Sequence, residues 1–215
     1  MGRGRWHAER RADPWYRMAK DEGYPSRAAY KLIHVQKKYD LIHRGDTVVD
    51  LGAAPGGMSM VAARLVGSDG RVVSVDTEPL TFSMSNVVYL ELDLFSSSVV
   101  DLILEALGGR KCDVLISDAS PKFSGVKEID MANQIRLTRR AVEIGDSVLM
   151  DGGSALLKAF ECEEVKCVET ALKRGFRFYR RVIPPPTLRR HSSELYLLCV
   201  GKRVSEVSLM VEENG

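Results

Sequence analysis

The sequence predicts an α/β fold in which a seven-stranded, mostly parallel sheet carries helices on both faces. Short apolar runs alternate with helical patterns through most of the 215 residues. These runs are continuously apolar, as expected of strands that are buried on both faces. The connection between the last two runs is too short for a crossover helix, so we expect the final strand to be antiparallel.

The N-terminal segment precedes the alternating pattern. Residues 1–22 are polar, rich in arginine and weakly periodic, so we expect a loose or extended arm. Ser26 can then cap a helix whose last turn carries Lys37 and Lys38, near the negative end of the helix dipole. Gly45 interrupts the chain before the first strand.

The elements beyond Gly45 follow in order. We expect strands over 47–51, 71–76, 87–92, 112–117, 154–159, 176–183 and 194–200. We expect helices over 58–66, 97–107, 129–149 and 162–174. In domain terms, the sequence predicts a basic arm over 1–24, a single folded domain over 25–203 and a short tail over 204–215.

Composition excludes several classes of protein. Hydrophobic residues make up 45% and charged residues 28% of the chain, which is ordinary for a globular protein and excludes disorder. No apolar run approaches the roughly 18 residues that span a membrane, and the N-terminus lacks a signal-peptide core. The 4 cysteines form no CxxC pair, which favours reduced thiols in a cytoplasmic protein. The 4 histidines show no metal-ligand spacing, so we expect no metal.

The net charge of +2 conceals an uneven distribution. Residues 1–44 carry a net +6 and residues 173–190 a net +7, whereas the central residues 45–172 carry a net −9. An acidic centre flanked by basic segments favours an anionic macromolecular partner such as RNA. No obligate protein partner is evident from the sequence.

A glycine-rich turn follows the first predicted strand, between Asp50 and Gly57. Such a turn brings backbone and a helix N-terminus to the sheet edge where open α/β sheets bind ligands. It is neither a GxGxxG nor a P-loop motif, which disfavours a dinucleotide or a nucleoside triphosphate. Asp76 and Asp93 end the next two strands, where carboxylates can accept hydrogen bonds from ribose hydroxyls or an adenine amino group. The sequence therefore predicts a site for an adenosine-type cofactor.

Five separated motifs resemble the FtsJ/RrmJ family of S-adenosylmethionine-dependent RNA ribose 2′-O-methyltransferases. They are SRAAYKL at 26–32, VDLGAAPGG at 49–57, SDASPKFSG at 117–125, LK at 157–158 and SELY at 193–196. The resemblance covers about residues 25–202 and implies a Rossmann-like methyltransferase fold. It also implies a catalytic tetrad of Lys31, Asp118, Lys158 and Glu194.

The resemblance also implies how the cofactor and the RNA are bound. The expected cofactor-binding residues are Gly52, Ala53, Pro55, Gly56, Gly57, Met58, Asp76, Asp93 and Asp118. Met58 departs from the family pattern, which often has an aromatic residue there. The expected RNA contacts are Arg27, Arg189 and Arg190. The tail after Lys202 is too short for the β-barrel that many archaeal relatives append, so RNA contacts are expected from the catalytic domain and its basic ends.

Lys158 is the most unusual residue of the tetrad, because it closes an otherwise apolar predicted strand. Burying a lysine is costly unless it is paired. The resemblance favours Lys158 as the acceptor of the ribose hydroxyl proton, which requires a lowered pKa. If Lys158 stays charged, it would instead stabilise a developing alkoxide. The sequence leaves both roles open.

The function implied by the resemblance is methylation of a ribose 2′-hydroxyl, at a uridine of large-subunit ribosomal RNA. One alternative is methylation of the tRNA anticodon loop. A second is a catalytically silent RNA-binding or ribosome-assembly factor, which retention of all four tetrad residues disfavours. A third, a nicotinamide-dependent oxidoreductase, is disfavoured because GxGxxG is missing.

Overall fold

The computed structural model describes residues 13–187 and 193–204. Its centre is a seven-stranded sheet with the strand order β3-β2-β1-β4-β5-β7-β6. The strands are β1 (Thr47–Leu51), β2 (Arg71–Asp76), β3 (Val87–Glu91), β4 (Cys112–Ser117), β5 (Leu149–Phe160), β6 (Phe176–Val182) and β7 (Glu194–Lys202). β7 pairs antiparallel with both β5 and β6, and the other pairs are parallel. The predicted fold class is confirmed.

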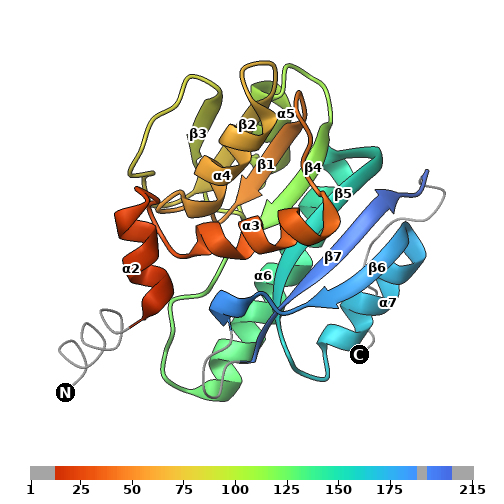
Figure 1. The fold of residues 1–215 in the computed structure, drawn as a ribbon. Helices are drawn as coiled ribbons and strands as arrows, with labels where there is room; N and C mark the ends of the chain where they lie inside the picture. Colours follow the sequence, from red (N-terminus) through yellow and green to blue (C-terminus); the bar gives the residue numbers. More distant parts are fainter. Residues whose placement is uncertain (1–12, 188–192, 205–215) are drawn as a thin grey trace.

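Helices cover both faces of the sheet. Helices α3 (Ala28–Tyr39) and α4 (Gly57–Val66) lie in front of it in Figure 1. The opposite face carries α5 (Val99–Ala106), α6 (Lys127–Val148) and α7 (Val165–Gly175). Because successive strand residues point to opposite faces, Val48 packs in the core with α3 and α4, and Val49 in the core with the other helices.

The strand order reverses between β1 and β4, since β2 and β3 continue from β1 to one side and β4 and β5 to the other. The carboxyl ends of these strands meet at one edge, which is where open α/β sheets place their ligands. The first residue of β7, Glu194, pairs with Phe160 at the carboxyl end of β5. The antiparallel strand thereby starts at that same edge.

The N-terminal segment differs from the prediction. The expectation of a loose or extended arm is wrong for residues 13–22, because helix α2 spans Pro14–Asp21. The side chain of Asp13 caps α2 by accepting from Trp15 N, and proline begins the helix, a position that suits its missing N–H. Arg27 also pairs with Asp13 at 2.7 Å. This start signal lies in a polar segment whose apolar periodicity is weak.

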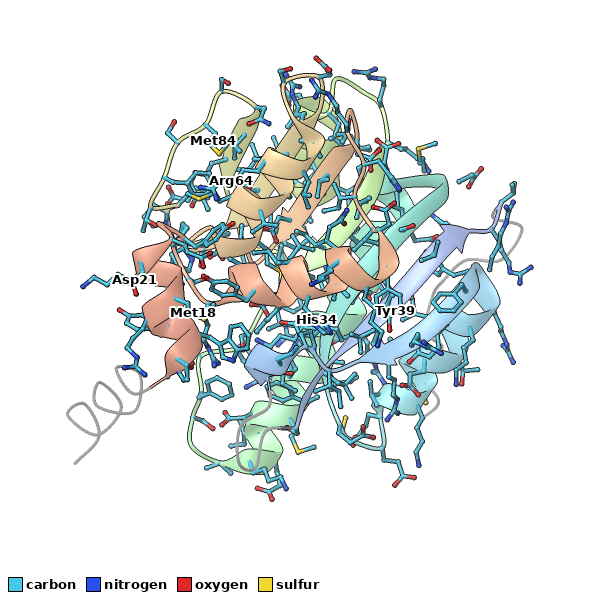
Figure 2. The ribbon with its side chains drawn as sticks, viewed as in Figure 1. Met18, Asp21, His34, Tyr39, Arg64 and Met84 are labelled. Carbon is cyan, nitrogen blue, oxygen red and sulfur yellow. The ribbon has the colours of Figure 1, made fainter. Side chains whose placement is uncertain are left out.

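Helix α2 lies beside α3 at the edge of the molecule, where Figure 2 labels Met18 and Asp21. Trp15 contacts Tyr30 of α3, with ring centroids 5.4 Å apart. A second difference concerns β5, which begins at Leu149 instead of Ser154, with an irregularity in its pairing to β4. A short 3₁₀ turn, η1 (Pro185–Thr187), follows β6. Among the described residues, no helix is long and apolar enough to cross a membrane.

Candidate active site

The glycine-rich turn between β1 and α4 is packed tightly beneath two loops. Gly52 has φ 72°, and a Cβ there would lie 2.4 Å from Cα of Ala119, just after β4. Gly56 has φ 111°, and a Cβ there would lie 2.3 Å from the ring of Phe82. Both positions need glycine for conformation and for space. The turn is thus fixed against the loops that follow β2 and β4.

The acidic residues after β2 and β3 are held by backbone groups. Asp76 accepts from Ala54 N at 2.8 Å and from Glu78 N at 3.0 Å, which ties it to the glycine-rich turn. Asp93 accepts from Phe95 N at 2.9 Å. Each carboxylate retains acceptor capacity, because a carboxylate offers about four lone-pair sites.

Two further side chains show how this part of the site is supported. Arg140 of α6 donates to the carbonyl oxygens of Leu94 and Ser96 at 2.7 and 3.3 Å, which fixes the loop after Asp93. Met58 is 2% exposed and belongs to the core beneath α3 and α4. Its role in cofactor binding stays a prediction.

Asp50 at the end of β1 is fully buried and has no cationic partner among the described residues. It accepts from Ser59 Oγ at 2.6 Å, and Ser59 in turn accepts from Ser74 Oγ at 2.8 Å. The other carboxylate oxygen of Asp50 accepts no hydrogen bond from the described part of the chain. Burial, aided by the charges of Asp118 and Asp76 and opposed by the Ser59 hydrogen bond, raises the pKa of Asp50 to about 7.

The four predicted tetrad residues come together at the carboxyl edge of the sheet. Lys31 on α3 lies 2.7 Å from Glu194 and 3.2 Å from Asp118. Lys158 on β5 lies 3.3 Å from Asp118 and 3.5 Å from Glu194. Two ammonium groups and two carboxylates therefore alternate in one cluster. Lys31 and Lys158 are 4% and 7% exposed, so their charges depend on this pairing.

Tyr196 belongs to the same cluster, although the sequence analysis did not include it. Its hydroxyl donates to Asp118 and accepts from Lys31 Nζ at 2.8 Å. The signal was available, because Tyr196 lies two residues after Glu194 on a strand and hence shares its face. A buried tyrosine also needs a partner for its hydroxyl. Because most residues of this strand are apolar, the sequence alone favours a core position for Tyr196.

The electrostatics of the cluster keep Asp118 and Lys158 charged. Burial alone would raise the pKa of Asp118, but the charges of Lys158 and Lys31 outweigh it and hold that pKa well below the ordinary value. Burial would lower the pKa of Lys158, but the charges of Asp118 and Glu194 raise it above the ordinary value. Lys158 is therefore an ammonium in the protein without substrate.

The three predicted RNA contacts have different outcomes. Arg27 pairs with Asp13 and supports the start of α2, so its contact with RNA stays a prediction. Arg189 and Arg190 lie outside the described residues. Within the described ranges, no group of three histidine, cysteine, aspartate or glutamate residues could hold a metal ion.

The residues at this edge suit a cationic adenosine cofactor. The glycine-rich turn lies at the strand ends, and Asp76 and Asp93 add acceptors for hydroxyl or amino groups. Asp50 is a buried carboxylate with one unpartnered oxygen and no cation of its own. Asp118 is an ionised carboxylate at the centre of the edge. This concentration of negative charge matches a sulfonium and an ammonium group better than a phosphate.

Comparisons with known proteins agree with this assignment. The FtsJ-like methyltransferase family matches residues 24–202. Ribosomal RNA large subunit methyltransferase E of Methanobrevibacter smithii is 42% identical over 195 residues, which cover 90% of this chain and 92% of the relative. The protein of that name from Pseudomonas fluorescens Pf0-1 is 38% identical, covering 89% and 90%. A crystal structure described as a ribosomal RNA methyltransferase from Plasmodium falciparum has a TM-score of 0.75 at 25% identity, covering 85% of this chain and all of its own.

Proposed function

Because the chain belongs to the FtsJ-like methyltransferase family, we propose that it methylates the 2′-hydroxyl of a uridine ribose in large-subunit ribosomal RNA. The names of its relatives indicate methyl transfer to ribosomal RNA. The methyl donor in this family is S-adenosylmethionine. The observation that carries the finer proposal is the cluster of Lys31, Asp118, Lys158 and Glu194 beside the glycine-rich turn.

The cofactor supplies a methyl group on a sulfonium, which is the electrophile of the reaction. The chain binds and orients it. We assign the ribose hydroxyls of the cofactor to Asp76 and its adenine amino group to Asp93, because both carboxylates follow strands at the cofactor edge. Asp118 follows β4 at the same edge and contacts both lysines, so we assign its negative charge to the sulfonium. Alignment of the two reactants can supply about 7–11 kcal/mol of the barrier.

Lys158 and Lys31 act on the ribose oxygen. A 2′-hydroxyl is a weak nucleophile, and its oxygen gains negative charge as its proton departs. An ammonium held in a water-poor site stabilises that charge. The raised pKa of Lys158 supports this electrostatic role over the role of proton acceptor, since an acceptor must first lose its own proton. The proton then passes to solvent, and Glu194 holds both lysines in place.

A labelling experiment tests the proposal. The protein is incubated with S-adenosylmethionine carrying a radioactive methyl group and with either large ribosomal subunits or bulk tRNA. We expect label in the large-subunit RNA and a single 2′-O-methyluridine when the site is mapped. Label on a base nitrogen or carbon would contradict ribose as the acceptor. Label in tRNA alone would contradict ribosomal RNA as the substrate, and no label in either RNA would contradict an active enzyme.

A further inference from the structure

We propose that Phe123 and Phe160 form a stacking surface for an unpaired base of the RNA substrate, beside the methyl-transfer site. This inference rests on the proposed function, since it concerns how the same RNA is held. Phe123 lies on the connection between β4 and α6, five residues after Asp118, and its side chain is 65% exposed. Among the described phenylalanines, Phe123 is the most exposed.

The two rings are arranged as a stack. Their centroids lie 6.3 Å apart, and their planes differ by only 11°. Phe160 is 9% exposed, so it forms the buried layer, whereas most of Phe123 still faces solvent. A flat ring with one neighbour beneath it and open space above can accept another flat ring.

Phe160 places this stack beside the catalytic cluster. Phe160 lies two residues after Lys158 on β5, so both side chains point to the same face of the sheet. Phe160 is also the direct cross-strand partner of Glu194 on β7. Side chains in such a pair are immediate neighbours. A ribose held at Lys158 would therefore bring its own base, or the next base along the strand, close to the two rings.

The loop that carries Phe123 is anchored. Asp130 of α6, which is buried, accepts from Ser124 N at 2.7 Å, from Ser124 Oγ at 2.8 Å and from Gly125 N at 3.3 Å. The residue next to Phe123 is thus tied to a helix. Figure 1 shows this connection as the long green segment that leads from β4 to the start of α6. A ring fixed before binding loses little entropy when a base stacks on it.

Charge and continuity favour a base over a protein as the occupant. The exposed Lys122 and Lys127 lie on either side of Phe123 in the chain, and proteins that bind single-stranded RNA combine aromatic rings with such cations. The exposed Val126 and Ile129 nearby would also suit an apolar protein surface. The RNA, however, must bind at the tetrad to react, and the two rings lie beside the tetrad. RNA is therefore the molecule that comes close to them.

The test measures the affinity of the full-length protein for a short unstructured RNA and for a matched oligomer of abasic ribose phosphate. We expect Phe123→Ala to weaken binding of the RNA by roughly ten-fold or more, and binding of the abasic oligomer by little. Phe123→Trp should retain the affinity for RNA, and Phe123→Leu should not, because leucine is apolar but has no ring. Met150→Ala is the control, since Met150 is also an exposed apolar side chain but lies at the start of β5, at the other end of the sheet.

Other outcomes would overturn the inference. Equal RNA affinity of Phe123→Ala and the unchanged protein would do so, as would an equal loss with the abasic oligomer. A leucine variant with full affinity would point to an apolar contact without stacking. If Phe123→Ala weakened binding to ribosomal subunits but not to the short RNA, the two rings would contact a ribosomal protein and not a base. Methylation of RNA by the unchanged protein, measured in parallel, separates failure of this inference from failure of the proposed function.

Discussion

Two polar clusters lie on the same face of the sheet, and each contains a carboxylate whose pKa is shifted in the opposite direction from the other. In the tetrad, Asp118 faces the ammonium groups of Lys31 and Lys158, and its pKa is lowered. At the end of β1, Asp50 faces only the hydroxyl of Ser59, and burial raises its pKa to about 7. Burial opposes the ionisation of both carboxylates, although Asp118 is the more exposed of the two, and at Asp118 the cations outweigh it.

This difference separates two functions within one site. The tetrad is complete without a ligand, because its positive and negative charges are equal in number and in contact. The Asp50 cluster is incomplete, because it holds a carboxylate that would gain from a cation. We infer that the tetrad is preorganised for the RNA, whereas the Asp50 cluster gains its charge partner only when the cationic cofactor binds.

The largest expected effect follows from removing a cation from the tetrad. Lys158→Met should slow methyl transfer roughly 10³-fold, the loss seen when a preorganised electrostatic group is removed from an active site. Cofactor affinity should change little, because Lys158 is not among the residues assigned to the cofactor. Single-turnover methyl transfer and calorimetric titration with S-adenosylmethionine measure the two quantities.

Two further variants of the same kind sharpen the interpretation. Lys158→Arg keeps a positive charge and should retain part of the rate, whereas a proton acceptor could not be replaced by arginine, which stays protonated. Lys111→Met is the matched control, because Lys111 is an exposed lysine at the start of β4, at the other end of the sheet. A rate for Lys158→Arg as low as that of Lys158→Met would contradict the electrostatic role.

The next effect concerns stability and tests the second cluster. Asp50 has a higher pKa in the folded than in the unfolded state, so its contribution is most favourable below about pH 4 and is lost as the pH rises through about 7. Asp50→Asn removes this titration while keeping an oxygen that accepts from Ser59. The variant should be more stable than the unchanged protein at pH 8, by up to about 4 kcal/mol, with the difference vanishing near pH 4. Urea unfolding across this pH range measures it.

The same variant has a second readout that links stability to binding. If the cofactor's positive charge completes the Asp50 cluster, Asp50→Asn should bind S-adenosylmethionine more weakly while being the more stable protein. Asp113→Asn is a control at the other end of the sheet, where the carboxylate accepts from Thr47 N at 2.8 Å. A gain in stability that does not depend on pH would count against titration of Asp50 as its cause.

Much of this organisation could be predicted from the sequence, because the elements that build the sheet carry strong local signals. The bounds of β2 and β4 agree with the predicted ranges, since each is an apolar run closed by a polar residue. Helix α2 was missed although its few apolar residues share one side of the helix, because they stand among charged residues and only Ala19 is buried. The sequence signal for its start is the Asp13-Pro14 pair, a helix cap followed by proline, which is short and lies within an arginine-rich segment.

The sequence predicted which residues form the site but not which of them are charged. The tetrad came from the resemblance, and its geometry follows from where α3, β4, β5 and β7 meet. Whether Lys158 is charged depends on the balance between burial and two carboxylates, and only the distances decide that balance. Tyr196 was missed for the same reason, because its sequence context does not distinguish a core side chain from a bridge between charged groups.

A smaller effect is expected from Tyr196→Phe, which removes a hydroxyl but no charge. Hydrogen bonds to charged groups contribute about 1.5–3 kcal/mol, so the variant should lose stability within that range. Its methyl-transfer rate should fall far less than that of Lys158→Met, because both ammonium groups remain. Tyr89→Phe is the control, since the Tyr89 hydroxyl donates to backbone carbonyls and not to a charged side chain. Rates as low as those of Lys158→Met would place Tyr196 in the chemistry itself.

The smallest effect is expected in the neutral part of the Asp50 cluster. Ser74→Ala removes the hydroxyl that donates to Ser59, which is an uncharged hydrogen bond worth about 0.5–1.5 kcal/mol. Ser59 keeps its own donation to Asp50, but without the Ser74 donor it becomes a weaker one, so the pKa of Asp50 should rise slightly further. The midpoint of the pH-dependent stability should therefore move to higher pH, and the loss of stability should be slightly larger at pH 8 than at pH 4. A midpoint that stays in place would mean that burial alone sets the pKa of Asp50, and that the two serines only fill the space beside it.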